Sequence, residues 1–167
     1  MRPLIEYLNE AAGLTPQGIY DMAVQLQQDG KVKEVKKIDS GWGDKEGFCF
    51  EIYYPKGLIL KIDFVGRGEY IYEYRSDKGD ETVGTNSTRE TDRTDWEEFL
   101  NPSRHLNQII TDLKKQIARA KGNSKRYYNA YNRANKSSDY EKYLHEESWI
   151  KKWESRTVRC TKLLSLA

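Results

Sequence analysis

The chain has 167 residues, of which 32% are charged, 37% hydrophobic and 12% aromatic, and its formal net charge at pH 7 is +2. The aromatic content excludes an intrinsically disordered chain, and no apolar run approaches the roughly eighteen residues that a membrane-spanning helix needs. We therefore expect a folded, cytoplasmic protein with no membrane segment. Its two cysteines, Cys49 and Cys160, are expected to be buried free thiols, because a reducing compartment disfavours a lasting disulfide.

The N-terminal residues predict two short helices. The first covers residues 3–12 and ends at Gly13, and the second begins at Pro16 after the N-cap Thr15 and ends at Gly30. This pair has the outline of a DNA-binding helix-turn-helix, but its second helix contains no Lys or Arg and two Asp, which would repel phosphate. We therefore prefer an amphipathic helical hairpin that covers a sheet.

Residues 31–38 predict an edge strand. Val32 and Ile38 are expected on one side of it and Val35 on the other. Four of these eight residues are lysines, which discourage pairing with other chains at the edge of a sheet. The turn-rich segment that follows contains Trp42, for which both a buried and an exposed position stay open.

The strongest pattern in the chain is an alternation of apolar and other side chains over residues 48–74. It divides into three strands, because residues 55–57 and 66–68 supply proline and glycine at two breaks. Antiparallel pairing of these strands gives a meander with one apolar face. The side chains expected to form the apolar sides of the strands are Phe48, Phe50, Ile52, Tyr54, Leu58, Leu60, Ile62, Phe64, Tyr70, Tyr72 and Tyr74.

Residues 76–93 are polar and acidic, with Val83 as their apolar exception. A short polar strand around residues 81–85 is expected to complete the sheet before a loop. Helix signals return at residues 94–97, where a capping box headed by Thr94 predicts a short helical turn. Asn101-Pro102 then caps and begins a longer helix.

Three helices are predicted in the C-terminal part of the chain. The first covers residues 102–121, where apolar side chains recur at spacings of three and four, and Gly122 is expected to end it. The second restarts at Ser124. The third begins with a capping box at residues 138–141 and continues, kinked or broken, toward Leu164.

These elements together predict an α+β fold. It consists of an N-terminal helical hairpin, an antiparallel β-meander of three to five strands and a C-terminal helical region. We expect residues 1–100 to form the α+β body and residues 101–167 to form a basic helical region that packs on it.

No motif in the sequence names a catalytic activity, so we expect a non-enzymatic protein without a cofactor or metal. His105 and His145 lie in separate polar helical settings without a second metal ligand at the right spacing, and both are expected at the surface. Glu34, Lys36 and Asp63 have residue types that a metal-dependent nuclease uses. Such a combination is common by chance in so charged a chain, so we prefer the edge-strand interpretation for Glu34 and Lys36.

Charge is unevenly distributed along the chain. Residues 104–137 contain nine basic side chains and a single acid, Asp112, whereas residues 76–103 contain three basic and eight acidic side chains. Surfaces exposed only to solvent normally mix both signs, so this segregation indicates an anionic partner.

The segment RYYNAYNR at residues 126–133 favours nucleic acid as that partner. Arg neutralises phosphate, tyrosine rings stack on unpaired bases and Asn bonds to base edges or sugars. Tyr127 and Tyr131 lie one helical turn apart, so an inward-packed pair is the alternative interpretation. The residues expected to bind nucleic acid are Lys114, Lys115, Arg119, Lys121, Lys125, Arg126, Tyr128, Tyr131 and Arg133.

Two functional hypotheses follow from these patterns. In the first, the basic C-terminal helices contact nucleic-acid phosphates with little sequence specificity. In the second, the chain is a small regulator, inhibitor or immunity-type protein that docks on a protein partner through its segregated charges, for example on an acidic protein surface. Exposed tyrosines beside arginine would favour the first, and an exposed apolar patch around Trp42, Trp149 or Trp153 would favour the second.

Overall fold

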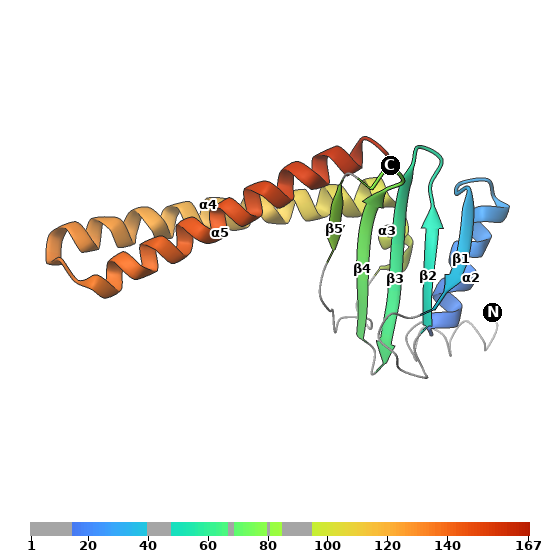
Figure 1. The fold of residues 1–167 in the computed structure, drawn as a ribbon, viewed down its shortest axis with the longest axis horizontal. Helices are drawn as coiled ribbons and strands as arrows, with labels where there is room; N and C mark the ends of the chain where they lie inside the picture. Colours follow the sequence, from blue (N-terminus) through green and yellow to red (C-terminus); the bar gives the residue numbers. More distant parts are fainter. Residues whose placement is uncertain (1–14, 40–47, 67–68, 80, 85–94) are drawn as a thin grey trace, which may run out of the picture.

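The computed structural model describes residues 15–39, 48–66, 69–79, 81–84 and 95–167. Within them, a helix is followed by a five-stranded antiparallel sheet and then by further helices, which is an α+β fold as the sequence predicted (Figure 1). The predicted helix at residues 3–12 and Trp42 lie outside the described residues, so the helical hairpin is represented by its second helix alone.

Helix α2 (Pro16–Gln28) begins and ends as its sequence predicts. The Thr15 hydroxyl accepts a hydrogen bond from the Gly18 N–H at 3.1 Å, and Pro16 occupies the first turn. After the helix, Gly30 adopts a positive φ of 72°, which glycine tolerates without steric cost. The inward side chains of α2, Ile19 and Ala23, are fully buried against the sheet, which agrees with the predicted amphipathic helix.

The sheet is a meander in which each strand pairs with the next one along the chain. Its order is β1-β2-β3-β4-β5, and all four pairings are antiparallel. The strands are β1 (Glu34–Ile38), β2 (Phe48–Tyr53), β3 (Leu58–Gly66), β4 (Glu69–Ser76) and β5 (Thr82–Gly84). The prediction that the lysine-rich segment forms an edge strand is confirmed. Val32 precedes β1 and is buried in the same core that Val35 packs against, so placing these two on opposite sides was wrong.

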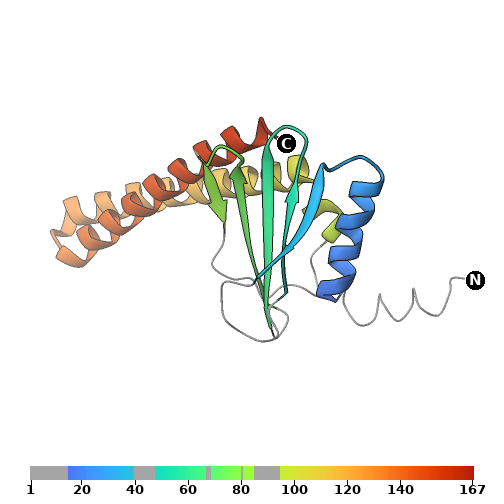
Figure 2. The same cartoon turned by 45° about the vertical axis from the view of Figure 1, so that its right-hand side comes forward.

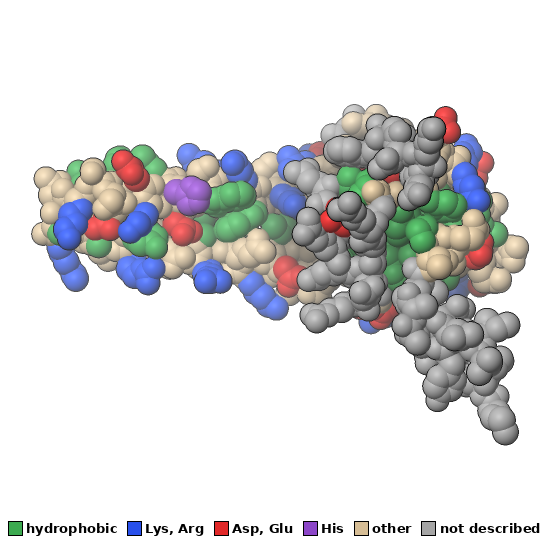
Figure 3. All heavy atoms as spheres, turned by 90° about the horizontal axis from the view of Figure 1, so that it is seen from below, with side chains coloured by type: hydrophobic (Ala, Val, Ile, Leu, Met, Phe, Trp, Pro, Cys, Tyr) green, Lys and Arg blue, Asp and Glu red, His purple; other side chains and the backbone are tan. Residues whose placement is uncertain are grey.

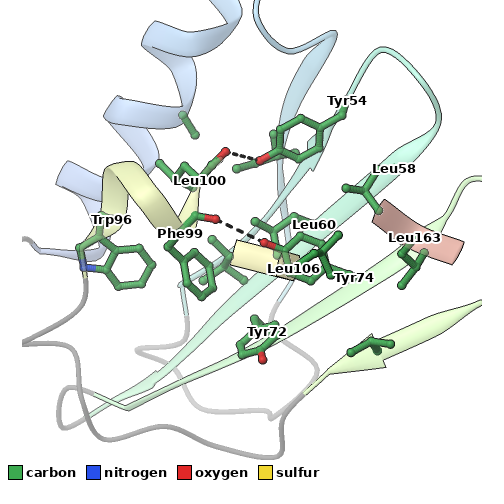
Figure 4. Packing of buried hydrophobic residues seen from close by; sticks show 14 of the residues in the cluster. Tyr54, Leu58, Leu60, Tyr72, Tyr74, Trp96, Phe99, Leu100, Leu106 and Leu163 are labelled. Carbon is green, nitrogen blue, oxygen red and sulfur yellow. Dashed lines mark hydrogen bonds between the residues drawn. The ribbon is translucent and has the colours of Figure 1, made fainter. Parts of the chain in front are cut away.

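One face of the sheet forms the hydrophobic core. The register places Phe50, Ile62 and Tyr72 in one cross-strand row and Ile52, Leu60 and Tyr74 in the next. All six are buried, and burial of a large apolar side chain contributes about 1.5–3 kcal/mol to folding. Two tyrosine hydroxyls tie the sheet to the helices, because Tyr54 donates to the Leu100 carbonyl at 2.7 Å and Tyr74 to the Phe99 carbonyl at 3.3 Å (Figure 4).

The opposite face of the sheet carries polar side chains that form hydrogen bonds with one another. Glu51 is buried, and its carboxylate accepts hydrogen bonds from Arg75 at 2.7 Å and from the Tyr53 hydroxyl at 2.6 Å. These bonds compensate the cost of removing the carboxylate from water.

Helix α3 (Trp96–Phe99) is a single turn that closes the core. Asp95 is its N-cap and accepts a hydrogen bond from the Glu98 N–H at 3.1 Å. The sequence predicted this helical turn but placed its N-cap at Thr94, one residue too early. Helix α4 then begins as expected, with the Asn101 side chain accepting from the Arg104 N–H.

Helices α4 (Pro102–Ala134) and α5 (Ser137–Leu164) are both continuous, which corrects three predictions. Gly122 does not end α4, since one exposed glycine costs about 1 kcal/mol, less than the packing on either side of it supplies. The predicted cap at Ser138 is wrong, because Asn135 ends α4 with a φ of 51° and α5 starts at Ser137 without a side-chain cap. No break separates the first part of α5 from Leu164.

The two long helices lie side by side and extend well past the β5 edge of the sheet (Figures 1 and 2). The core cluster contains α4 side chains as far as Leu113 and α5 side chains from Trp153 onward. We call residues 114–152, which lie between them, the arm. Side chains from both sides of residue 100 share the core, and the division of the chain at that residue stays a prediction.

Candidate nucleic-acid interface

The arm is held together by a seam with the spacing of a coiled coil. The inward residues of α4 follow one another at alternating intervals of four and three, the pattern of knobs-into-holes packing. They are Leu106, Ile110, Leu113, Ile117, Ala120, Ser124, Tyr127 and Tyr131, and all are buried or half-buried. From α5 the buried or half-buried partners in the arm and at its base are Tyr143, Glu147, Ile150, Trp153, Thr157 and Cys160.

The chemistry of this seam changes along the arm. Near the sheet it is apolar, whereas Ser124 is buried midway along α4 and donates a short hydrogen bond to the Glu147 carboxylate. Toward the tip the seam is built from tyrosines, whose ring centroids lie 5.2 Å apart for Tyr128 and Tyr143. The distance is 5.0 Å for Tyr131 and Tyr140. The alternative interpretation of an inward-facing Tyr127 and Tyr131 therefore agrees with their half-buried positions.

Three acids of α5 are directed at α4. Glu146 accepts from the Asn123 amide at 3.4 Å, Glu147 accepts from Ser124, and Glu154 pairs with Lys121 at 2.8 Å. Two of these three carboxylates bond to uncharged side chains of α4, and Glu154 alone neutralises an α4 cation among these contacts.

Four of the predicted cations have neither a carboxylate nor an aromatic partner within the described part of the chain. Lys114, Arg119, Lys125 and Arg133 are exposed, and no described carboxylate forms an ion pair with any of them. The other three predicted cations have partners. Lys115 lies 3.9 Å from Asp112, Lys121 is paired with Glu154, and the Arg126 guanidinium lies over the Tyr127 ring at 5.0 Å from its centroid.

The helical repeat divides these cations into two groups. Lys115, Arg119, Arg126 and Arg133 follow one another at intervals of four and seven, which places them in one row on the side of α4 opposite the seam. We call these four residues the basic row. Lys114, Lys121 and Lys125 lie on a flank of the helix, between the basic row and the seam.

The predicted tyrosines differ in their access to a partner. Tyr128 is 45% exposed, whereas Tyr131 is half-buried against Tyr140. Helical geometry places Tyr128 nearer to the seam than to the basic row. The structure therefore brings the predicted cations together along one helix and directs one of the two predicted tyrosines into the seam.

A tryptophan of α5 forms a second exposed feature of the arm. Trp149 is 39% exposed, stacks on Trp153 with ring centroids 5.4 Å apart, and donates a hydrogen bond from Nε1 to His145 Nε2 at 2.9 Å. On the face seen in Figure 3, hydrophobic side chains of the helical pair form a patch beside a histidine, with basic side chains along both margins. The exposed position expected for His145 is confirmed.

His105, in contrast, is not the surface histidine that the sequence indicated. Its ring lies among Tyr72, Tyr74 and Phe99, and its Nδ1 is 2.8 Å from the Tyr74 hydroxyl. Burial lowers the pKa of His105 to about 4, so the ring is neutral at pH 7. We interpret it as a packing and hydrogen-bonding residue of the core.

The cysteines are buried free thiols, as predicted. Burial, with a smaller contribution from Asp63, raises the pKa of Cys49 to about 12, and burial also raises the pKa of Cys160. Both thiols are therefore protonated at neutral pH, and a protonated thiol is a poor nucleophile. Among the described residues, no group of three or more His, Cys, Asp or Glu side chains is placed to hold a metal ion. Glu34 and Lys36 pair with each other at 3.0 Å.

A hollow of about 800 Å³, which the sequence did not predict, lies at the other end of the molecule. It lies between α2, the β2–β3 turn and the start of α4, with an apolar floor that includes Leu26 and Leu100. Lys31, Lys56 and Arg104 contribute positive charge to its lining, and Lys56 donates to the Ala167 backbone oxygen at 2.9 Å. No periodic signal marks this hollow, because its lining comes from several separate stretches of the chain.

Comparison of the chain with protein-family models, with curated proteins and with solved structures found no match. No helix within the described residues is both long enough and apolar enough to cross a bilayer. Function is therefore inferred from the arrangement of side chains.

Proposed function

We propose that this protein binds nucleic acid through phosphate contacts made by α4, with little sequence specificity. The observation that carries this proposal is the set of four exposed cations, Lys114, Arg119, Lys125 and Arg133, without a carboxylate or aromatic partner among the described residues. They are carried on an arm that extends beyond the sheet, where a long polyanion can approach without meeting the body (Figure 1). Contacts with phosphate position a protein on nucleic acid but carry no sequence information.

Fluorescence anisotropy of labelled single- and double-stranded oligonucleotides tests this function. Four phosphate contacts predict a drop in affinity on the order of a hundredfold between about 50 and about 200 mM salt, because each neutralised phosphate releases counterions. The double variant Arg119→Glu/Arg133→Glu should abolish binding. Lys31→Glu/Lys78→Glu is the matched control, since it changes the net charge equally on exposed body residues.

Two results would contradict nucleic-acid binding by α4. One is the absence of binding by the wild-type protein even at the lower salt concentration. The other is an equal loss of affinity in Arg119→Glu/Arg133→Glu and in the control Lys31→Glu/Lys78→Glu, which would indicate a response to net charge alone.

A second candidate function is docking on a protein partner, as a small regulator, inhibitor or immunity-type protein would do. The observation that favours it is the exposed Trp149, stacked on Trp153, because exposed tryptophans are typical anchors of protein interfaces. Capture of a partner by the wild-type protein and loss of that capture in Trp149→Ser, without oligonucleotide binding by either, would favour this function over the first.

A further inference from the structure

Gly122 interrupts the line of large side chains on the exposed side of α4. It lies in the same helical row as Arg119 and Arg126, three residues after one and four before the other. In the interior of an exposed helix, glycine costs about 1 kcal/mol relative to alanine, because it has more conformational freedom to lose.

Nothing within the described protein requires a glycine at this position. The backbone of Gly122 is helical, without the positive φ that favours glycine elsewhere in the chain. No atom beyond the helix's own backbone lies within 4 Å of the point where a Cβ would be, so alanine would fit without a clash. The space left by the missing side chain is therefore open to solvent.

That space continues into a shallow trough along the back of α4. The trough has a volume of about 430 Å³ and is lined by Gly122, Lys125, Arg126, Asn129, Ala130 and Arg133. Three of the six lining residues are basic, one is an amide and two are small, and none is acidic. Residues 122–133 of a helix span about 16 Å, so the trough is elongated rather than round.

Two cationic residues, Lys125 and Arg126, line the trough together with Gly122. Helical side chains lean toward the turn that precedes them, which for these two residues is the turn that begins at Gly122. The Arg126 guanidinium is additionally held over the Tyr127 ring and donates to the Tyr127 hydroxyl at 3.3 Å. Two cations and an open backbone thus meet at one end of the trough.

We propose that a phosphodiester phosphate of the bound nucleic acid sits over Gly122, between Lys125 and Arg126, with the strand continuing along the trough toward Arg133. This site rests on the proposed function and adds to it a position and an orientation of the nucleic-acid backbone. The missing side chain allows the phosphate to approach the helix more closely than it could beside any larger residue. Asn129 and Arg133 supply a donor amide and a further cation along the strand.

The variant Gly122→Leu separates this site from a diffuse attraction between charges. It fills the trough without changing any charge, and it replaces glycine with a strong helix former. We expect the dissociation constant for a labelled duplex at about 50 mM salt to rise about tenfold while the melting temperature rises. The slope of log affinity against log salt should fall by about one, as for the loss of one phosphate contact.

Ser148→Leu is the matched control, because it adds the same side chain to an exposed position of α5. Its dissociation constant should equal that of the wild-type protein. If Gly122→Leu binds as the wild type does, the site at Gly122 is wrong and nucleic-acid binding by α4 stands. If the wild-type protein does not bind at all, both proposals fall.

Discussion

At the scale of single residues, His105 shows how the core determines the chemistry of a side chain. Its ring is enclosed by aromatic rings from β4 and α3, the closest being Phe99 with ring centroids 4.3 Å apart. Tyr72 and Tyr74 beside it stay neutral over the ordinary pH range, because burial raises the pKa of both hydroxyls, that of Tyr72 to about 12. Burial of the ring disfavours a positive charge on His105. Of these three neighbouring groups, His105 is therefore the one that titrates in the acidic range.

The lowered pKa of His105 predicts a loss of stability on acidification. The ring titrates near pH 4 in the folded protein and near its ordinary value of 6.5 when unfolded, so between these values the unfolded chain binds more protons. The free energy of unfolding should therefore fall as the pH falls from about 6.5 to about 4, by at most about 3 kcal/mol. Urea denaturation at several pH values measures this change in the free energy of unfolding.

The control for this pH dependence is His105→Gln, which removes the titrating ring and keeps polar atoms for the Tyr74 hydroxyl. We expect its unfolding free energy to change less between pH 6.5 and 4.5 than that of the wild-type protein. Parallel curves for the two proteins would show that other groups cause the acid sensitivity.

The environment of His105 could not be predicted from its neighbours in sequence. It precedes Leu106 on a helix whose polar side is exposed, and the tyrosines that enclose it come from β4, about thirty residues earlier. The pairing of β3 with β4 was predictable from alternation, but the angle at which α4 crosses the sheet was not. That crossing decides which polar residue of the helix is covered.

At the scale of elements, the meander was predictable and the continuity of the long helices was not. Alternation is read residue by residue, so the faces of β2, β3 and β4 follow directly from the positions of Phe50, Ile62 and Tyr72. Gly122 and Ser138 gave local signals for a break and a cap. At Gly122 the seam between α4 and α5 overrides the signal, since packing along a heptad pattern outweighs the propensity of one residue. At the other end of the turn, α5 begins one residue before Ser138 and has no side-chain cap.

The seam predicts a specific response to changes at Ser124 and Glu147. Glu147→Ala should destabilise the protein by about 1–2 kcal/mol, because the buried Ser124 hydroxyl loses its partner. The double variant Ser124→Ala/Glu147→Leu should recover that stability or exceed that of the wild-type protein, because an apolar pair needs no desolvation of charge. Thermal melting followed by circular dichroism compares the three proteins.

The seam interpretation would be contradicted if the single and the double variant melted at the same temperature. Ser148→Leu again provides a control, since this residue is exposed on α5 next to Glu147 in sequence and should leave the melting temperature nearly unchanged.

At the scale of the whole molecule, the core and the proposed nucleic-acid contacts lie in different parts of one chain. The core cluster ends at Leu113 in α4 and resumes at Trp153 in α5, whereas the proposed phosphate contacts from Lys114 to Arg133 belong to the arm. The basic character of this region was predictable from a count of charges. Its separation from the body was not, because the length of an arm depends on where two helices leave the sheet.

A shortened protein tests this separation. Deleting residues 118–131 and 139–152 removes two heptads from each helix, which keeps the seam in register and retains the Asn135-Lys136 turn. We expect the sheet to fold, with a melting temperature within about 5 °C of the wild-type value, because no residue of the core cluster is removed. Oligonucleotide binding should weaken strongly, because Arg119, Lys121, Lys125 and Arg126 are removed. Unfolding of the shortened protein would show that the arm stabilises the body.

The arm also has a mechanical consequence. The 21 residues of α4 that follow Leu113 extend about 30 Å beyond the last core contact of the helix, so a tilt of about 10° at the base moves the tip by about 5 Å. A lever of this length converts small adjustments of helix packing into displacements comparable to the spacing between neighbouring phosphates. The body can therefore stay rigid while the proposed phosphate contacts move with the tip.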